Sequence, residues 1–219
     1  ILIKEDKKDL SLNLIEKKFK ELKNPSIRIQ YELANIYKNF KKYEKAIEYY
    51  SKILSTLDIK SPVFADILYK RGSSYERMEK YNLADKDLLK SIKISSGDPY
   101  TLNYLAYSWL ERNHKIDEAF KMLEKAYNNT ENDPYITDSV GWAYYKIENY
   151  ELAEEYLKKA VQLMPDDPVV NDHYGDVLWQ LNRKLQARYF WENVLTLEDT
   201  DEKMKLEIKN KLLNGPKKT

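Results

Sequence analysis

The sequence predicts an all-α protein made of about five repeated helix–turn–helix units. Glycine and proline number only 5 and 7 among 219 residues, whereas a β-sandwich needs their special backbone angles at its turns. Two further observations are a set of regularly spaced helix starts and a set of small residues that recurs with a nearly constant period. A fixed period of a few tens of residues is typical of stacked helix pairs.

The helix starts are marked by five dipeptides. In each, a polar side chain that can cap a helix precedes a proline, which fits the first helical turn because no N–H is needed there. We therefore expect a helix to begin at each of Asn24-Pro25, Ser61-Pro62, Asp98-Pro99, Asp133-Pro134 and Asp167-Pro168.

A small residue follows each start by about eight residues, at Ala34, Gly72, Ala106, Gly141 and Gly175. A second small residue follows twelve or thirteen residues later, at Ala46, Ala84, Ala119, Ala153 and Ala187, with spacings of 38, 35, 34 and 34. Glycine destabilises a helix interior by about 1 kcal/mol relative to alanine. Its recurrence therefore predicts that the two helices of a unit approach too closely to admit a side chain.

This pattern resembles the tetratricopeptide repeat (TPR). The large position of the first helix reads Tyr37, Tyr75, Trp109, Tyr144 and Leu178, and that of the second reads Tyr50, Leu88, Leu123, Leu157 and Trp191. The resemblance implies a right-handed superhelix, an α-solenoid, with repeats at 27–60, 65–96, 99–131, 134–166 and 168–199 within an array at 27–199.

Two segments flank the predicted array. Residues 1–24 are expected to be the second helix of a partial repeat, because the amphipathic stretch from Leu10 to Leu22 has no opening partner helix. Residues 200–214 are expected to form a capping helix with Met204, Ile208 and Leu212 on one face, before a tail at 215–219. The chain begins at Ile1 rather than Met, so we interpret it as a fragment or processed form of a longer protein.

A narrower resemblance concerns the last three repeats. Residues 102–109, 136–145 and 170–176 look like the closing repeats of bacterial multi-TPR proteins, many of them exported and some of them outer-membrane lipoproteins that act as adaptors. This resemblance implies a bacterial origin and a cell-envelope or periplasmic location, with the cytoplasm as the alternative. No apolar run approaches the roughly 20 residues that span a bilayer, so no membrane-spanning segment is predicted.

The sequence offers little for catalysis. It has no cysteine, and its two histidines, His114 and His173, fall in different repeats, where we expect an ordinary turn residue and an ordinary helix-face residue. No two glycines are close enough to form a phosphate-binding loop. We therefore predict neither an enzyme nor a cofactor or metal site.

The inner, concave wall of the predicted array is the candidate binding surface. Residues two, five, nine and twelve places into each repeat share one face of the first helix, and from the third repeat onward these positions mix aromatic side chains with Asn and Asp. Aromatic side chains facing water favour a binding role, although they could instead pack along the helix pair. The predicted partner-binding residues are Tyr69, Asn103, Tyr107, Asp138, Trp142, Tyr145, Asp172, Asp176 and Trp179.

Charge is unevenly distributed, although the net charge is +1. Residues 1–93 carry 21 Lys and Arg against 14 Asp and Glu, while residues 131–176 carry 3 against 11. Such an excess is usually a solvated face. If it is functional, it disfavours nucleic acid and favours a peptide that carries Lys or Arg.

Three functions are compatible with these features. The first hypothesis is a non-enzymatic scaffold or adaptor that holds a protein or peptide partner in the concave groove. The second is self-assembly into a homo-oligomer, through the open first half-repeat or the last helix. The third, an RNA-binding repeat, is disfavoured because the C-terminal wall is acidic.

Overall fold

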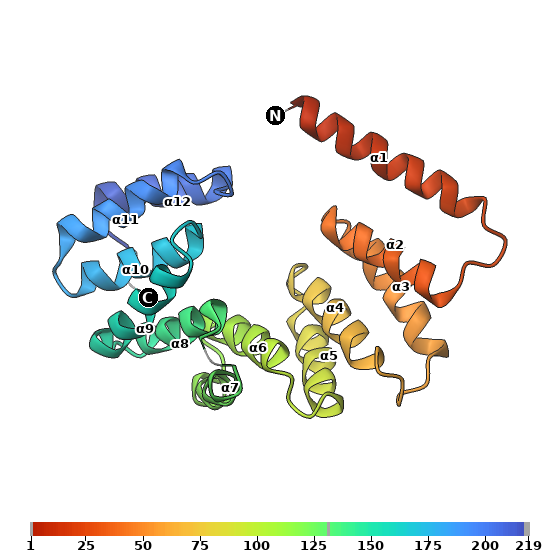
Figure 1. The fold of residues 1–219 in the computed structure, drawn as a ribbon, viewed down its shortest axis with the longest axis horizontal. Coiled ribbons are helices and arrows are strands. Elements are labelled where there is room, and N and C mark those ends of the chain that lie inside the picture. Colours follow the sequence, from red (N-terminus) through yellow and green to blue (C-terminus); the bar gives the residue numbers. More distant parts are fainter. Residues whose placement is uncertain (1, 131, 217–219) are drawn as a thin grey trace. The chain divides into compact units, whose positions relative to one another are not determined.

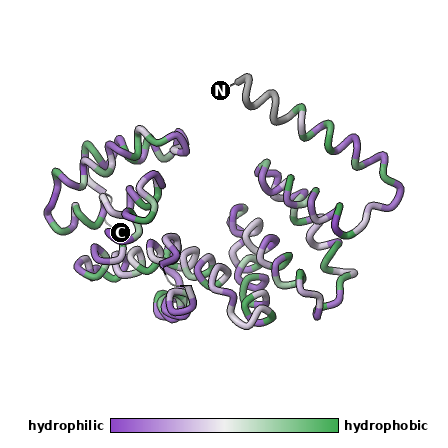
Figure 2. The backbone as a smooth tube through the Cα atoms, viewed as in Figure 1, coloured by the Kyte–Doolittle hydropathy of each residue, from purple (hydrophilic) through white to green (hydrophobic). Residues whose placement is uncertain are grey.

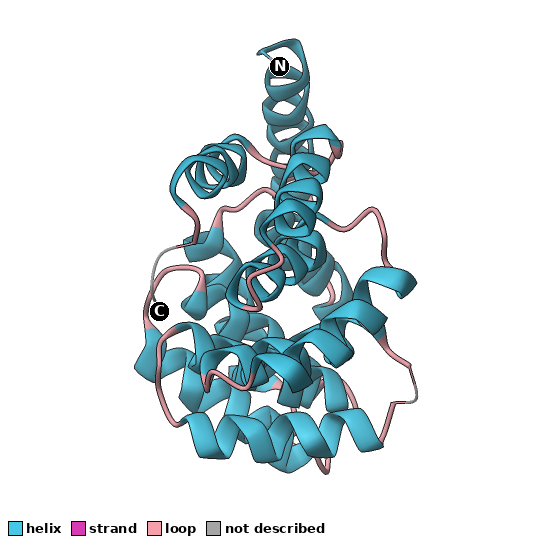
Figure 3. Ribbon diagram, turned by 90° about the vertical axis from the view of Figure 1, so that its left-hand side faces the viewer, coloured by secondary structure: helices cyan, strands magenta, loops and turns pink. Residues whose placement is uncertain are grey.

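A computed structural model describes residues 2–130 and 132–216. The described residues form twelve α-helices and no strand, which confirms the all-α fold class (Figures 1 and 3). Hydrophilic and hydrophobic residues are mixed along the helices (Figure 2), and none of the described helices has the length and apolarity needed to cross a membrane. The chain divides into two compact units, residues 1–91 and residues 92–219.

Unit 1 contains four helices and most of a fifth. They are α1 (Leu2–Lys20), α2 (Ile27–Asn39), α3 (Tyr43–Thr56), α4 (Phe64–Glu76) and α5 (Tyr81–Ile94). Leu33, Ala34, Tyr37, Ala46 and Tyr50 form its buried core between α2 and α3, with Leu12 of α1 packed against them.

An ion pair joins α4 to α5. The guanidinium of Arg71 donates two hydrogen bonds to the carboxylate of Asp87, at 2.6 and 2.8 Å, and a third to Ser51 of α3 at 3.0 Å. Because Asp87 is buried, this geometry supplies the partners that a desolvated carboxylate requires.

Unit 2 contains the remaining seven helices, of which the first six form three successive pairs and the seventh packs against the sixth (Figure 1). They are α6 (Pro99–Glu111), α7 (Ile116–Asn128), α8 (Pro134–Lys146), α9 (Tyr150–Leu163), α10 (Pro168–Gln180), α11 (Lys184–Thr196) and α12 (Glu202–Asn214). The first helices of the pairs also contact one another, since α6 packs on α8 and α8 on α10. The first helices α6, α8 and α10 therefore present one common face, which is called here the inner wall of unit 2.

The predicted helix starts are confirmed in unit 2 and wrong in detail in unit 1. Asp98, Asp133 and Asp167 each accept a backbone N–H of the following turn, with proline in that turn. In contrast, Ser26 caps α2, two residues beyond Asn24. Helix α4 begins at Phe64 with no side-chain cap, because two successive turns from Asp58 to Phe64 displace its start.

The small positions pack as predicted. A Cβ atom added to Gly72 would lie 2.9 Å from Cγ of Leu88, and one added to Gly141 would lie 2.7 Å from Cγ of Leu157. At Gly175 it would collide with the indole of Trp191. The large residue of each second helix therefore fills the space that the glycine leaves on the first.

Candidate functional site

A pocket of about 510 Å³ lies on the inner wall of unit 2 and is called here the wall pocket. Its lining comes from the first helices of three successive pairs and from α12. Five predicted partner-binding residues line it: Tyr107, Trp142, Tyr145, Asp172 and Asp176. Side chains from helices far apart in the sequence therefore converge on one hollow, as ligand sites in proteins generally require.

Three aromatic rings form the floor of the wall pocket. The Trp142 indole lies between the Tyr145 ring, with centroids 4.6 Å apart, and the His173 ring, with centroids 4.1 Å apart, and both pairs are nearly parallel. Its Nε1–H donates a hydrogen bond to Glu111 at 2.7 Å. Trp142 is only 7% exposed and Tyr145 only 1%.

The expectation that Trp142 and Tyr145 face water was therefore wrong. Spacing along α8 correctly put both residues on the inner wall. It did not reveal that His173, from the next pair, covers the second face of the Trp142 ring. These two aromatic residues form the base of the pocket rather than projecting into the groove.

His173 joins three helices of the wall. Its Nδ1 donates to Asp138 on α8 and lies 3.0 Å from both carboxylate oxygens, while Nε2 lies 3.4 Å from the hydroxyl of Tyr107 on α6. Burial alone would lower the pKa of His173, but the charge and hydrogen bond of Asp138 outweigh it and raise the pKa above 6.5. The interpretation of His173 as an ordinary helix-face residue was wrong, because its ring contacts side chains of α6 and α8.

The acidic pair on α10 is occupied by a lysine of the same chain. Nζ of Lys211 on α12 lies 2.6 Å from Asp172 and 2.8 Å from Asp176, and the other oxygen of Asp176 accepts the indole N–H of Trp191 at 3.1 Å. Burial and the neighbouring charge of Asp172 raise the pKa of Asp176 to about 7, while Lys211 opposes this shift. Part of the acidic excess is thus explained by folding, rather than by a solvated face or a partner site.

The other predicted residues lie outside the pocket lining. The ring of Trp179 packs against Gly215 of the pocket lining, and the φ of 79° and the missing side chain of Gly215 allow this close approach. Asn103 is half-buried on α6, and its Oδ1 has no hydrogen-bond partner among the described residues. Tyr69 belongs to α4 of unit 1, where the ammonium of Lys38 lies 5.6 Å from its ring centroid.

Among the wall-pocket residues that sequence reasoning missed, three carry the polar contacts described above: Glu111, His173 and Lys211. Glu111 and His173 each follow a predicted wall position by one residue, so a wider count on the same helix face would have included them. Lys211 was missed because α12 was interpreted only as a cap.

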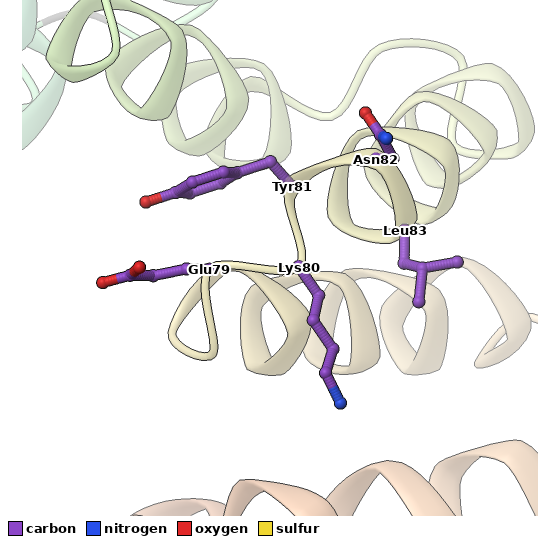
Figure 4. A pocket seen from close by; sticks show the side chains of 5 residues that line it. All are labelled: Glu79, Lys80, Tyr81, Asn82 and Leu83. Carbon is purple, nitrogen blue, oxygen red and sulfur yellow. The ribbon is translucent and has the colours of Figure 1, made fainter.

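Two other features offer less for binding. A pocket at the turn between α4 and α5 is lined only by residues 79–83, whose side chains spread in different directions (Figure 4), so no groups converge there. In the described part of the chain, no group of three or more His, Cys, Asp or Glu side chains is arranged to hold a metal ion.

Comparison with known proteins finds tetratricopeptide repeats in this architecture. Two models of the tetratricopeptide repeat match, one at residues 27–56 and 65–98 and the other at residues 138–167. The TPR repeat-containing protein PA4667 of Pseudomonas aeruginosa is 28% identical over 176 residues, which are 80% of this chain and 29% of that protein. The chain therefore spans less than a third of that relative.

Solved structures share the fold at low sequence identity. The crystal structure of PilW, described as a widely conserved type IV pilus biogenesis factor, matches with a TM-score of 0.72 and 17% identity, covering 88% of this chain and 86% of PilW. TTC0263, a thermophilic TPR protein of Thermus thermophilus, matches with a TM-score of 0.71 and 16% identity, covering 86% of this chain and 100% of that protein. The likeness to these structures shows the α-solenoid fold, and the repeat matches together with the helix packing described above show that the chain contains tetratricopeptide repeats.

Proposed function

We propose that the chain is a non-enzymatic adaptor that holds a segment of a partner protein on the inner wall of unit 2. Tetratricopeptide repeats are generally protein–protein interaction modules, and proteins built from them are typically non-enzymatic scaffolds. The observation that carries the proposal is the wall pocket, in which α6, α8, α10 and α12 all contribute side chains to one hollow.

The chemistry of the lining favours a basic partner segment. The carboxylates of Glu111, Asp172, Asp176, Asp201 and Glu207 outnumber two lysines in the lining. A Lys or Arg side chain entering the pocket gains charge-assisted hydrogen bonds, and its aliphatic stem can cover the aromatic floor. Phosphate groups are disfavoured because they would meet these carboxylates.

Site-specific photo-crosslinking tests the proposal. A photoreactive phenylalanine analogue replaces Tyr107 in the wall pocket or, as the control, Lys158 on the exposed face of α9. We expect a partner protein to be crosslinked in cell extract from position 107 and not from position 158. Crosslinking of the same proteins from both positions would contradict a specific site.

The crosslinked partner is then purified and its affinity measured by calorimetry. Glu111→Lys reverses one carboxylate of the pocket and should weaken binding at least tenfold, about 1.4 kcal/mol. Because Glu111 also accepts the indole N–H of Trp142, a thermal melt measures the accompanying loss of stability. Lys158→Glu changes charge by the same amount in the opposite direction on α9 and should bind like the wild type. Unchanged affinity of the Glu111→Lys variant would place the partner elsewhere.

A second candidate function, self-assembly, is favoured by an apolar surface on unit 1. Leu10 and Leu14 of α1 are 68% and 59% exposed, and a pocket of about 510 Å³ between α1 and α2 includes Leu14, Leu22 and Ile29. A second copy that covers this face would bury apolar area. Light scattering should then show a molar mass that rises with concentration and falls to the monomer in Leu14→Lys. A concentration-independent monomer would exclude this function.

A further inference from the structure

Helix α12 is in register with the first helices of the repeats. Its N-cap, Asp201, follows Asp167 by the 34-residue period, and its side chain accepts the N–H of Met204 at 2.9 Å, just as the earlier Asp residues cap α6, α8 and α10. All four helices have 13 residues. The chain therefore places α12 where the first helix of a further repeat would stack.

Helix α12 buries far fewer residues than α6, α8 and α10 do. Only Ile208 is buried among its 13 residues, compared with eight residues in α10. The position that corresponds to Gly175 is occupied in α12 by Lys209, which is exposed. No close neighbour therefore demands a small residue there, as Trp191 does at Gly175. A helix that buries so little apolar surface opens locally at lower free energy than its neighbours.

Specific polar contacts hold α12 in place. The ammonium of Lys211 is held between Asp172 and Asp176, and the Lys211 side chain is 19% exposed while that of Asp176 is 5% exposed. Beyond the end of the helix, Gly215 lies against the ring of Trp179. Asp172, Asp176 and Trp179 are three of the predicted partner-binding residues, and the chain's own C-terminal segment covers all three.

We infer that α12 is an exchangeable internal ligand, which a basic amphipathic helix of the partner protein replaces on α10 and α11. The replacing helix carries a Lys or Arg three residues after an aliphatic side chain, as Lys211 follows Ile208. Its cation pairs with Asp172 and Asp176, and its aliphatic side chain fills the site of Ile208. This inference rests on the proposed function and refines it. Asp201 and Glu207 leave the wall pocket with α12, so the carboxylates that meet the partner are Glu111, Asp172 and Asp176.

The charge of the site supports this occupant over an acidic or purely apolar one. Two carboxylates that lie close together are costly to bury without a cation, so displacement of Lys211 requires another cation in its place. An apolar helix would leave Asp172 and Asp176 unpaired, and an acidic helix would add repulsion.

Hydrogen exchange of the full chain tests whether α12 opens. Amides of α12 should exchange at least tenfold faster than amides of α10. Lys211→Met should raise the exchange rate of the α12 amides by a further tenfold and leave the exchange rates of the α8 and α10 amides unchanged. Lys205→Met is the matched control, because Lys205 pairs with Glu202 of the same helix, at 3.0 Å, rather than with α10. Equal protection of α12 and α10 would overturn the inference, since α12 would then be a fixed part of the array.

A peptide of residues 198–216 with a fluorescent label tests exchange directly. It should bind the Lys211→Met chain at least tenfold more tightly than the wild-type chain, because the wild-type helix competes at the high effective concentration of a tethered segment. The same peptide with Met in place of Lys211 should not bind. Equal affinity for both chains, binding of the Met peptide or absence of binding would each overturn the inference.

Ile208→Ala provides a second variant if Lys211→Met fails to fold. It loosens α12 while leaving the Asp172, Asp176 and Lys211 charges unchanged, and it should also increase peptide binding at least tenfold. The peptide belongs to this chain, so its result is independent of any partner. Crosslinking from position 107 without peptide exchange would overturn only this inference, whereas peptide exchange without a crosslinked partner would overturn the proposed function.

Discussion

The imidazole Nδ1 of His173 lies 3.0 Å from both carboxylate oxygens of Asp138, so a charged hydrogen bond joins α10 to α8 inside unit 2. The same ring stacks on Trp142 and approaches Tyr107. Protonation of one buried histidine is therefore linked to the geometry of the wall pocket.

Stability should fall as the pH rises from about 4 to 7, and should continue to fall above pH 6.5 as His173 loses its proton. The raised pKa of His173 adds stability that is complete below the unfolded pKa of about 6.5 and is lost as pH passes the folded pKa. The raised pKa of Asp176 has the same sign, with its loss between 3.8 and about 7. Each group lowers the free energy of unfolding by at most about 1.4 kcal/mol per pH unit, and urea unfolding at several pH values measures this slope.

Two variants and one titration check this assignment. His173→Phe and Asp176→Asn should each flatten the pH dependence. Because the chain has only two histidines, NMR can resolve the buried His173, which should titrate above pH 6.5. A His173 that titrates below pH 6.5 would contradict the role of Asp138.

Replacement of Gly141 by alanine should destabilise the protein by about 1–3 kcal/mol. Helix propensity alone predicts the opposite, a gain of about 1 kcal/mol. The added Cβ would lie 2.7 Å from Cγ of Leu157 and 3.1 Å from its backbone N, so overpacking outweighs propensity. Thermal unfolding decides the sign, with the exposed Lys158→Ala on α9 as a near-neutral control.

Truncation of Trp142 to alanine should lower the free energy of unfolding by about 3–5 kcal/mol. The indole is buried between Tyr145 and His173, so its removal leaves a cavity and also loses the hydrogen bond to Glu111. Chemical denaturation measures the loss. A melt identical to the wild type would show that Trp142 is not part of the core.

In unit 1, Arg71→Met should cost about 3–5 kcal/mol, because it leaves the buried Asp87 without its cation. The double variant Arg71→Met/Asp87→Leu should recover most of this loss, since replacing both charges removes the desolvation penalty. A double-mutant cycle by urea unfolding measures the coupling. Additive losses would mean that the two residues do not interact.

The repeat architecture follows from the sequence because its signals are local. An Asp before a Pro caps its own helix, and a glycine eight residues later shares its unit with the large residue it accommodates, as Gly141 does with Leu157. Periodicity also places Tyr107, Trp142, Tyr145, Asp172 and Asp176 on one wall, where they line one pocket. These relations lie within a single repeat or recur with its period, so the sequence alone determines them.

The chemistry of the wall was decided only by the tertiary structure. Trp142 is covered by His173 from the next repeat, and Asp172 is neutralised by Lys211, 39 residues away on a helix with no second helix paired to it in the described part of the chain. Burial and charge pairing depend on which side chains meet across repeats, and periodicity gives the face of a helix but not its neighbours. For this reason, the sequence determines where the wall lies, and packing between repeats determines which of its groups remain open to a partner.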